Sequence, residues 1–127
     1  MGDRGRIMIV EDDPTIRQLM AEILRDAGHE VVECASGEEA LSHLNADPPL
    51  LITLDLAMPS MDGLEFLRVL RERSDPAEIP VVVVTAAPAF LRHELLKEGH
   101  LTLAKPFHME QLLEVVEHLL GQRRSAT

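Results

Sequence analysis

Three acidic side chains, Glu11, Asp12 and Asp55, stand where two apolar segments of the chain end. Glu11 and Asp12 follow residues 7–10, and Asp55 follows residues 50–54. If these segments are neighbouring parallel strands, their carboxyl ends share one edge of the sheet and the three carboxylates converge there. Two carboxylates ~4 Å apart repel by about 4 kcal/mol at an effective dielectric constant of about 20. A bound cation or protonation of one acid must offset this repulsion, and hard oxygen ligands with open positions favour Mg²⁺.

Thr85 and Lys105 add a hydroxyl donor and a fixed positive charge to this set. Thr85 ends the apolar segment that begins at residue 81, and Lys105 lies just beyond residues 101–103. With a divalent cation, these groups are suited to stabilise a phosphoryl group in transfer, a reaction that depends mainly on positioning and charge neutralisation. A carboxylate can itself act as the nucleophile and form an aspartyl phosphate. The spacing therefore predicts phosphoryl chemistry at the sheet edge.

Five short apolar segments that contain β-branched residues alternate with longer segments of helical spacing. The short segments are residues 7–10, 31–32, 50–54, 81–84 and 101–103. This alternation predicts an α/β fold, (βα)5, with a doubly wound parallel five-stranded sheet and helices on both faces. The crossovers should be right-handed. A flavodoxin-like strand order, 2-1-3-4-5, places the first and third strands side by side, as convergence of the acids requires.

The first two expected helices carry clear start and stop signals. Asp13 can cap a helix with Pro14 in its first turn, and Gly28 ends that helix. Capping explains Asp13 fully, so it stays outside the site. Ser36 and Glu39 have the spacing of a capping box before the second helix. Six apolar residues of the first helix are expected on one face: Ile16, Leu19, Met20, Ile23, Leu24 and Ala27.

The later helices are marked less evenly. Asp62 and Glu65 repeat the capping-box spacing before the third helix. The fourth, within residues 88–98, looks short and has no clear cap. The last helix is expected to stop at Gly121. We predict one domain over residues 1–127, with a core at about 6–121 and a flexible tail at 122–127.

Composition excludes several classes of function. The net charge of −10 disfavours binding to nucleic acid and to an anionic membrane surface. The chain shows no apolar stretch long enough for a secretory signal or a membrane span. Cys34 is the one cysteine, so no intramolecular disulfide can form, and a reducing cytoplasm is expected. We interpret Cys34 as a small buried apolar residue.

The histidines give no metal motif. His93 and Glu94 begin like a zinc-protease helix motif, but Lys97 stands where the second histidine is needed. The remaining histidines have no partner at ligand spacing, and we expect surface or structural roles for them: His29, His43, His100, His108 and His118.

Four blocks of the sequence resemble the response-regulator receiver family, in the family's order and over residues about 6–121. The resemblance implies a phosphoacceptor receiver domain of a two-component or phosphorelay system, which takes a phosphoryl group from a histidine kinase and switches partner binding. The blocks are Ile7-Met8-Ile9-Val10-Glu11-Asp12-Asp13-Pro14, Asp55-Leu56-Ala57-Met58-Pro59-Ser60-Met61-Asp62-Gly63, Thr85-Ala86 and Lys105-Pro106-Phe107.

The resemblance also implies a role for each acid. Asp55 is the expected phosphoacceptor. Asp12 and Asp55 are expected to bind Mg²⁺ together with the backbone carbonyl of Ala57, and Glu11 to support the metal through water. Asp62 and Gly63 are turn and cap residues first, and we assign them no catalytic role.

The same resemblance extends to the switch residues. Lys105 is expected to bridge Asp55 and the phosphate, Thr85 to be the switch hydroxyl, and Lys105–Pro106 to be a cis bond. The family usually has Tyr or Phe three residues before this lysine, and here Thr102 stands there. The acceptor pocket is intact, while coupling of the switch to an aromatic ring must be weaker or different.

Two alternatives stay open. A degenerate receiver would act as a protein-interaction scaffold without phosphorylation, which Thr102 favours and the complete pocket opposes. An aspartate-nucleophile phosphatase usually has a second acid two residues after the nucleophile, where this chain has Ala57.

The expected partners are a sensor histidine kinase or phosphotransfer protein and a separate downstream protein, since no effector domain follows Gly121 in this sequence. A second possibility is that the chain was cut from a longer regulator. We expect a monomer or a weak dimer. The chain is expected to catalyse only its own phosphorylation and dephosphorylation, so we do not class it as an enzyme.

Overall fold

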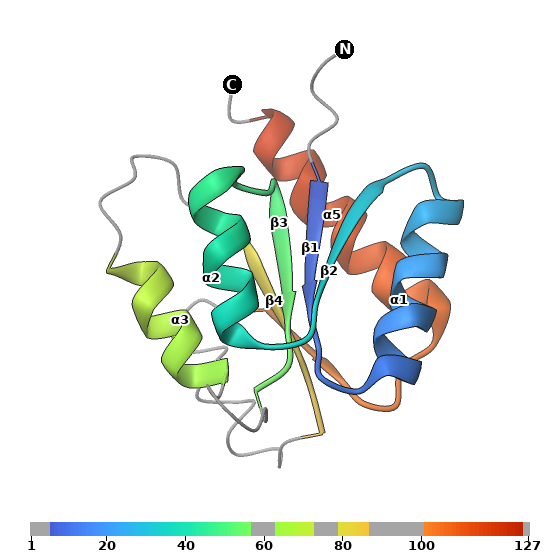
Figure 1. Ribbon diagram of the computed structural model, residues 1–127. Helices are drawn as coiled ribbons and strands as arrows, with labels where there is room; N and C mark the ends of the chain where they lie inside the picture. The colour runs from blue at the N-terminus through green and yellow to red at the C-terminus, as the bar shows by residue number, and fades with distance from the viewer. Residues whose placement is uncertain (1–5, 57–62, 73–78, 87–100, 126–127) are drawn as a thin grey trace.

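A computed structural model describes residues 6–56, 63–72, 79–86 and 101–125 (Figure 1). Five parallel strands form one sheet in the order β2-β1-β3-β4-β5, which confirms the predicted α/β fold and strand order. Every strand lies where the apolar segments predicted it, with ends that differ by one or two residues. The strands are β1 (Arg6–Val10), β2 (Glu30–Cys34), β3 (Leu51–Leu54), β4 (Val81–Thr85) and β5 (Leu101–Ala104).

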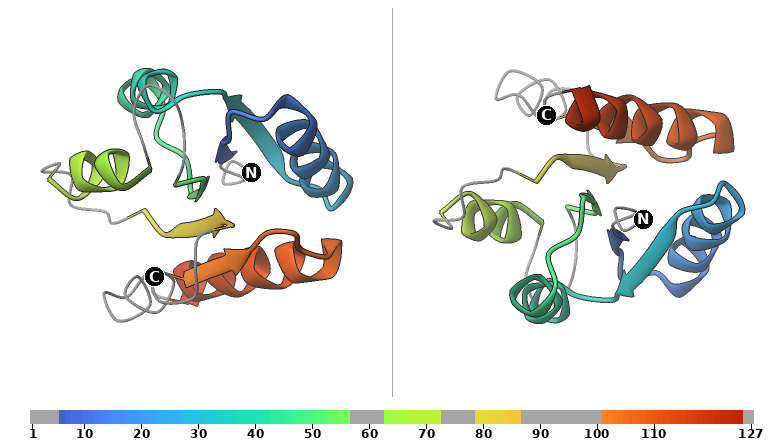
Figure 2. Two further views of the ribbon diagram at one scale, coloured as in Figure 1. Left: turned by 90° about the horizontal axis from the view of Figure 1, so that it is seen from below. Right: turned by 90° about the horizontal axis from the view of Figure 1, so that it is seen from above.

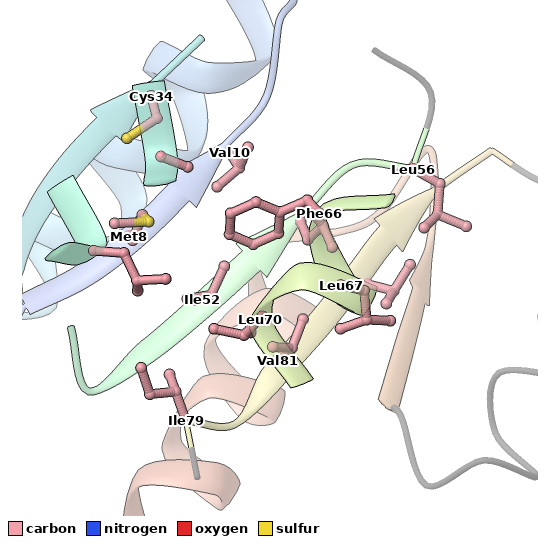
Figure 3. Close-up of a cluster of buried hydrophobic side chains, with 14 residues drawn as sticks. Met8, Val10, Cys34, Ile52, Leu56, Phe66, Leu67, Leu70, Ile79 and Val81 are labelled. Atoms are coloured by element: carbon pink, nitrogen blue, oxygen red, sulfur yellow. The ribbon is translucent and has the colours of Figure 1, made fainter. Parts of the chain in front are cut away.

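Described helices cover both faces of this sheet (Figures 1 and 2). α2 (Gly37–Ala46) and α3 (Gly63–Arg71) lie on one face, and α1 (Pro14–Asp26) and α5 (Met109–Ser125) lie on the other. The buried side chains accordingly form two clusters. Met8 of β1 packs into the first cluster with Phe66 of α3 (Figure 3), whereas Ile9 packs into the second with Leu24 of α1. Alternate residues of a strand thus serve opposite faces.

The predicted helix caps are present in α1 and α2. The Asp13 carboxylate accepts hydrogen bonds from the backbone N–H groups of Thr15 and Ile16. Gly28, with φ of 97°, follows the C-cap of α1, and its N–H donates to Arg25 O at 2.9 Å. In α2, Ser36 Oγ accepts from the N–H of Glu39 at 3.1 Å. Local side-chain chemistry therefore sets both helix starts.

Two expectations about helices were wrong. α5 does not stop at Gly121 but runs to Ser125, because Gly121 does not adopt the positive φ that ends a helix. Leu19 and Ala27 do not join the buried face of α1: Leu19 is 52% exposed, and Ala27 is exposed at the C-cap. The buried stripe of α1 includes Ala21 instead, which leaves Leu19 at its border. The cap at Asp62 and the fourth helix lie outside the described residues.

Cys34 is fully buried in the first cluster, as predicted (Figure 3). Burial raises the pKa of its thiol to about 12. None of the helices that the structure describes combines the length and apolar character needed to cross a membrane.

Gly63, the first residue of α3, lies against the backbone that follows β3. Its N–H donates to Leu56 O at 2.7 Å. A Cβ atom at this position would come closer than 3.0 Å to Asp55 O and Leu56 Cα. Only glycine therefore allows α3 to begin this close to Asp55. At Gly121, by contrast, an added Cβ would meet no atom within 4 Å.

The same substitution should have opposite effects at these two glycines. Gly63→Ala should lower the free energy of unfolding by at least about 1–3 kcal/mol, because the new methyl group meets backbone atoms. Gly121→Ala should raise it by up to about 1 kcal/mol, because alanine favours the helix. Urea unfolding measures both. Equal stability of Gly63→Ala and the wild type would contradict the close contact.

Thr53 in β3 has the one buried side-chain polar atom without a hydrogen-bond partner among the residues that the structure describes. Its side chain is 1% exposed. Ile9 of β1 and Val82 of β4 are its strand neighbours, and both pack into the second cluster. The hydroxyl group is thus desolvated among aliphatic side chains.

Thr53→Val should therefore raise the free energy of unfolding by about 1 kcal/mol, since a methyl group replaces a hydroxyl that gains nothing from burial. Val82→Thr is the matched reverse change, and it should lower the same quantity by about 1–3 kcal/mol. Urea unfolding of both variants tests the pair. A loss of stability in Thr53→Val would show that the hydroxyl has a partner.

Candidate functional site

The register of β1 and β3 brings the predicted acids together. Val10 pairs with Leu54, so the two strands end level. The N–H of Asp55 then donates to Val10 O at 3.0 Å, and the N–H of Glu11 donates to Cys34 O at 3.0 Å. Backbone hydrogen bonds just beyond the strand ends thus fix the positions of Glu11 and Asp55.

The three acids form one buried cluster. Glu11 is 2% exposed and Asp55 is 7% exposed, while Asp12 is half-buried. One carboxylate oxygen from each residue lies within 4.8 Å of the other two. The convergence that the strand order predicted is therefore present. Three oxygen donors at this separation fit a small divalent cation.

Lys105 places a positive charge against this acidic cluster. Its Nζ lies 2.7 Å from Glu11 Oε1 and 3.7 Å from Asp55 Oδ2. The N–H of Lys105 donates to Thr85 O at 2.9 Å, which fixes the lysine beyond β5. The Lys105–Pro106 bond is cis, as predicted. The ammonium group lies nearer to Glu11 than to Asp55.

Burial and neighbouring groups shift the pKa of Glu11 in opposite directions. Burial raises this pKa above its ordinary value, and the Asp55 carboxylate raises it further. The hydrogen bond from Lys105 and its charge oppose both effects, as does the hydrogen bond from the N–H of Asp13. A single ammonium group does not fully compensate the buried acids, so the cluster retains an attraction for cations.

Thr85 and Thr102 lie on β4 and β5 near the same edge. Thr85 is 3% exposed and is the last residue of β4. Thr102 is half-buried and pairs with Val83. Because Leu103 packs into the second cluster, Thr102 faces the opposite side of the sheet. Ala57, whose carbonyl we expected to bind metal, lies outside the described residues.

Sequence reasoning missed two residues that hold the pocket in place. The Arg17 guanidinium donates to Glu11 O at 2.9 Å through Nη1, and its Nε lies 3.6 Å from Glu33 Oε1. Gly63 packs against the backbone of Asp55. The Asp62-Gly63 pair signals a turn in the sequence, but the close approach to Asp55 depends on how α3 packs.

One prediction about the histidines was wrong. His43 does have partners at ligand distance, because atoms of Cys34, Glu39 and His43 lie within 4.8 Å of one another. Glu39 and His43 are four residues apart on α2, and the sheet topology brings the end of β2 beside them. Cys34 is nine residues before His43, so the sequence alone does not show that the three side chains meet.

Comparison with known proteins agrees with this geometry. Residues 7–117 match the family model described as the response regulator receiver domain. The transcriptional regulatory protein PhoP of Escherichia coli is 32% identical over 117 residues, which cover 91% of this chain and 52% of PhoP. The response regulator protein FleR of Pseudomonas aeruginosa is 37% identical over 121 residues, or 93% of this chain and 25% of FleR. The chain thus spans about half of PhoP and a quarter of FleR.

Solved structures show the same likeness. The chemotaxis protein CheY4 of Vibrio cholerae superposes with a TM-score of 0.81 at 32% identity, covering 91% of this chain and 98% of that one. A CheY-like response regulator receiver domain protein from Methanospirillum hungatei has a TM-score of 0.85 at 26% identity, covering 97% and 98%. Family model, relatives, fold and acidic pocket agree, and the chain belongs to the response regulator receiver domain family of two-component signalling.

Proposed function

We propose that Asp55 accepts a phosphoryl group from a phosphohistidine, with Mg²⁺ held by Asp12, Asp55 and the carbonyl of Ala57 and supported by Glu11 through water. The observation that carries this proposal is the buried cluster of three carboxylates with the Lys105 ammonium group against two of them. The donor set fits Mg²⁺, which prefers oxygen ligands and keeps several waters.

The transfer breaks the P–N bond of the donor and forms a P–O bond to the Asp55 carboxylate. Bound Mg²⁺ would supply charge neutralisation for the phosphoryl oxygens. Lys105, already 3.7 Å from Asp55 Oδ2, offers a second positive charge that needs little rearrangement. The Thr85 hydroxyl is the proposed donor to a phosphoryl oxygen.

Phosphorylation should redistribute the contacts of Lys105. The aspartyl phosphate carries about 1.5–2 negative charges, compared with one on the free carboxylate. This added charge competes with Glu11 for the ammonium group, which now lies 2.7 Å from Glu11. We propose that Lys105 moves from Glu11 to the phosphate, and that this rearrangement biases a two-state equilibrium read by a partner.

The signal must reach its reader without an aromatic ring at position 102. Thr102 is half-buried on β5 and offers a small polar side chain. We propose a sensor histidine kinase or phosphotransfer protein as donor, a downstream protein as reader, and the cytoplasm as compartment. Receiver domains are generally not enzymes, and we propose that this one catalyses only its own phosphorylation and dephosphorylation. The scaffold and phosphatase alternatives are not favoured, since the family match accompanies a cluster of three carboxylates with Lys105 against it.

Incubation with a small phosphodonor and Mg²⁺, followed by intact mass measurement, tests the acceptor. The wild type should gain one phosphoryl group, and Asp55→Asn should gain none, because the nucleophilic oxygen pair is lost. Asp13→Asn is the matched control. Its side chain caps α1, asparagine caps equally well, and uptake should match the wild type. Phosphoryl uptake by Asp55→Asn at the wild-type level would refute Asp55 as acceptor.

Metal binding is tested separately, without a phosphodonor. Mg²⁺ at a hundredfold excess over its dissociation constant should raise the free energy of unfolding by about 2.7 kcal/mol, because only the folded pocket binds it. Asp12→Asn should lose most of this stabilisation, and Asp13→Asn should keep it. Thermal unfolding in Mg²⁺ and in chelator gives the comparison. Equal stabilisation of both variants would place the metal elsewhere.

A further inference from the structure

A second group of potential metal ligands lies beside the acidic pocket. Cys34 ends β2, and Glu39 and His43 lie four residues apart on α2. Side chains at this spacing share one face of a helix. One ligand atom from each of the three residues lies within 4.8 Å of the other two. Strand and helix together thus present sulfur, oxygen and nitrogen to one point.

We propose that Cys34, Glu39 and His43 bind one Zn²⁺ ion, with water in the fourth position. Thiolate, imidazole and carboxylate are the three ligand types that zinc takes from proteins. Zinc–ligand bonds are about 2.0–2.3 Å long, so the three ligand atoms, now within 4.8 Å of one another, must come closer together by roughly 1 Å. Glu39 is exposed, so its side chain has room to rotate toward the buried sulfur.

A backbone contact already orients one of these ligands. Glu39 Oε1 accepts a hydrogen bond from the N–H of Ala35 at 2.8 Å. This bond holds the carboxylate over the connection between β2 and α2, next to Cys34. Such outer contacts fix the direction of a ligand and strengthen binding. The capping interaction that starts α2 therefore also prepares the proposed site.

Zinc binding at Cys34 must release a proton. The S–H bond breaks, the sulfur–zinc bond forms, and the proton passes to solvent. Because zinc binds the thiolate and not the thiol, each bound ion displaces the thiol proton.

The proposed zinc site differs in chemistry from the acidic pocket. The pocket offers carboxylate oxygens, which suit Mg²⁺, whereas thiolate and imidazole select zinc-like ions. The two sites adjoin, since the carbonyl of Cys34 accepts from the N–H of Glu11 at 3.0 Å. The inference stands independently of phosphorylation at Asp55.

Cobalt in place of zinc tests the proposal on the whole chain, with millimolar Mg²⁺ present to fill the oxygen pocket. The chain has one cysteine, so a thiolate-to-cobalt charge-transfer band reports Cys34 alone. We expect the band to saturate at one equivalent of Co²⁺ and to disappear when Zn²⁺ is added. Absence of the band at millimolar Co²⁺ would overturn the proposal.

Substitutions of Glu39 and His43 on α2 test the ligands without changing the buried Cys34. His43→Gln and Glu39→Gln should each weaken Co²⁺ binding at least tenfold. In Glu39→Gln, the glutamine amide oxygen can still accept the hydrogen bond from the N–H of Ala35. His118→Gln on α5 is the matched control and should bind as the wild type does. Circular dichroism checks that each variant is folded. Equal affinity of His43→Gln and His118→Gln would exclude His43 as a ligand and overturn the site.

Discussion

Repulsion among buried carboxylates, offset by the ammonium group of Lys105, is the constraint on which this molecule depends. Glu11 and Asp55 are almost fully buried at the ends of adjacent strands. Lys105 follows the edge strand β5, and its ammonium group lies against both carboxylates but closer to that of Glu11. Burial of like charges disfavours folding unless a counter-charge is present. The fold thus keeps an electrostatic imbalance at the shared carboxyl end of β1 and β3.

Features encoded within a few residues could be predicted from the sequence. Apolar segments located all five strands, and Asp13 and Gly28 marked the ends of α1 because caps depend on neighbouring backbone groups. The convergence of Glu11, Asp12 and Asp55 also followed, since the strand order alone places two strand ends together. Roles taken from the family resemblance remain proposals, including that of Thr102.

Features that depend on packing between distant segments could not be predicted in this way. Gly121 resembles a helix stop, yet the helix continues because its backbone angle is set by the whole of α5. Leu19 has helical spacing, but the rotation of α1 on the sheet leaves it exposed. Cys34 and His43 meet only because α2 folds back beside β2. Each case needs the orientation of one element on another, which periodicity does not give.

Arg17 links the pocket to the edge strand β2. One guanidinium nitrogen holds the carbonyl of Glu11, and another lies near Glu33 on β2. The residue itself belongs to the first turns of α1. A displacement of the Glu11 backbone must therefore stretch this bond or pull the arginine with it. Arg17 thus joins the Glu11 backbone, α1 and the edge strand β2 through two contacts, neither of which involves β4 or β5.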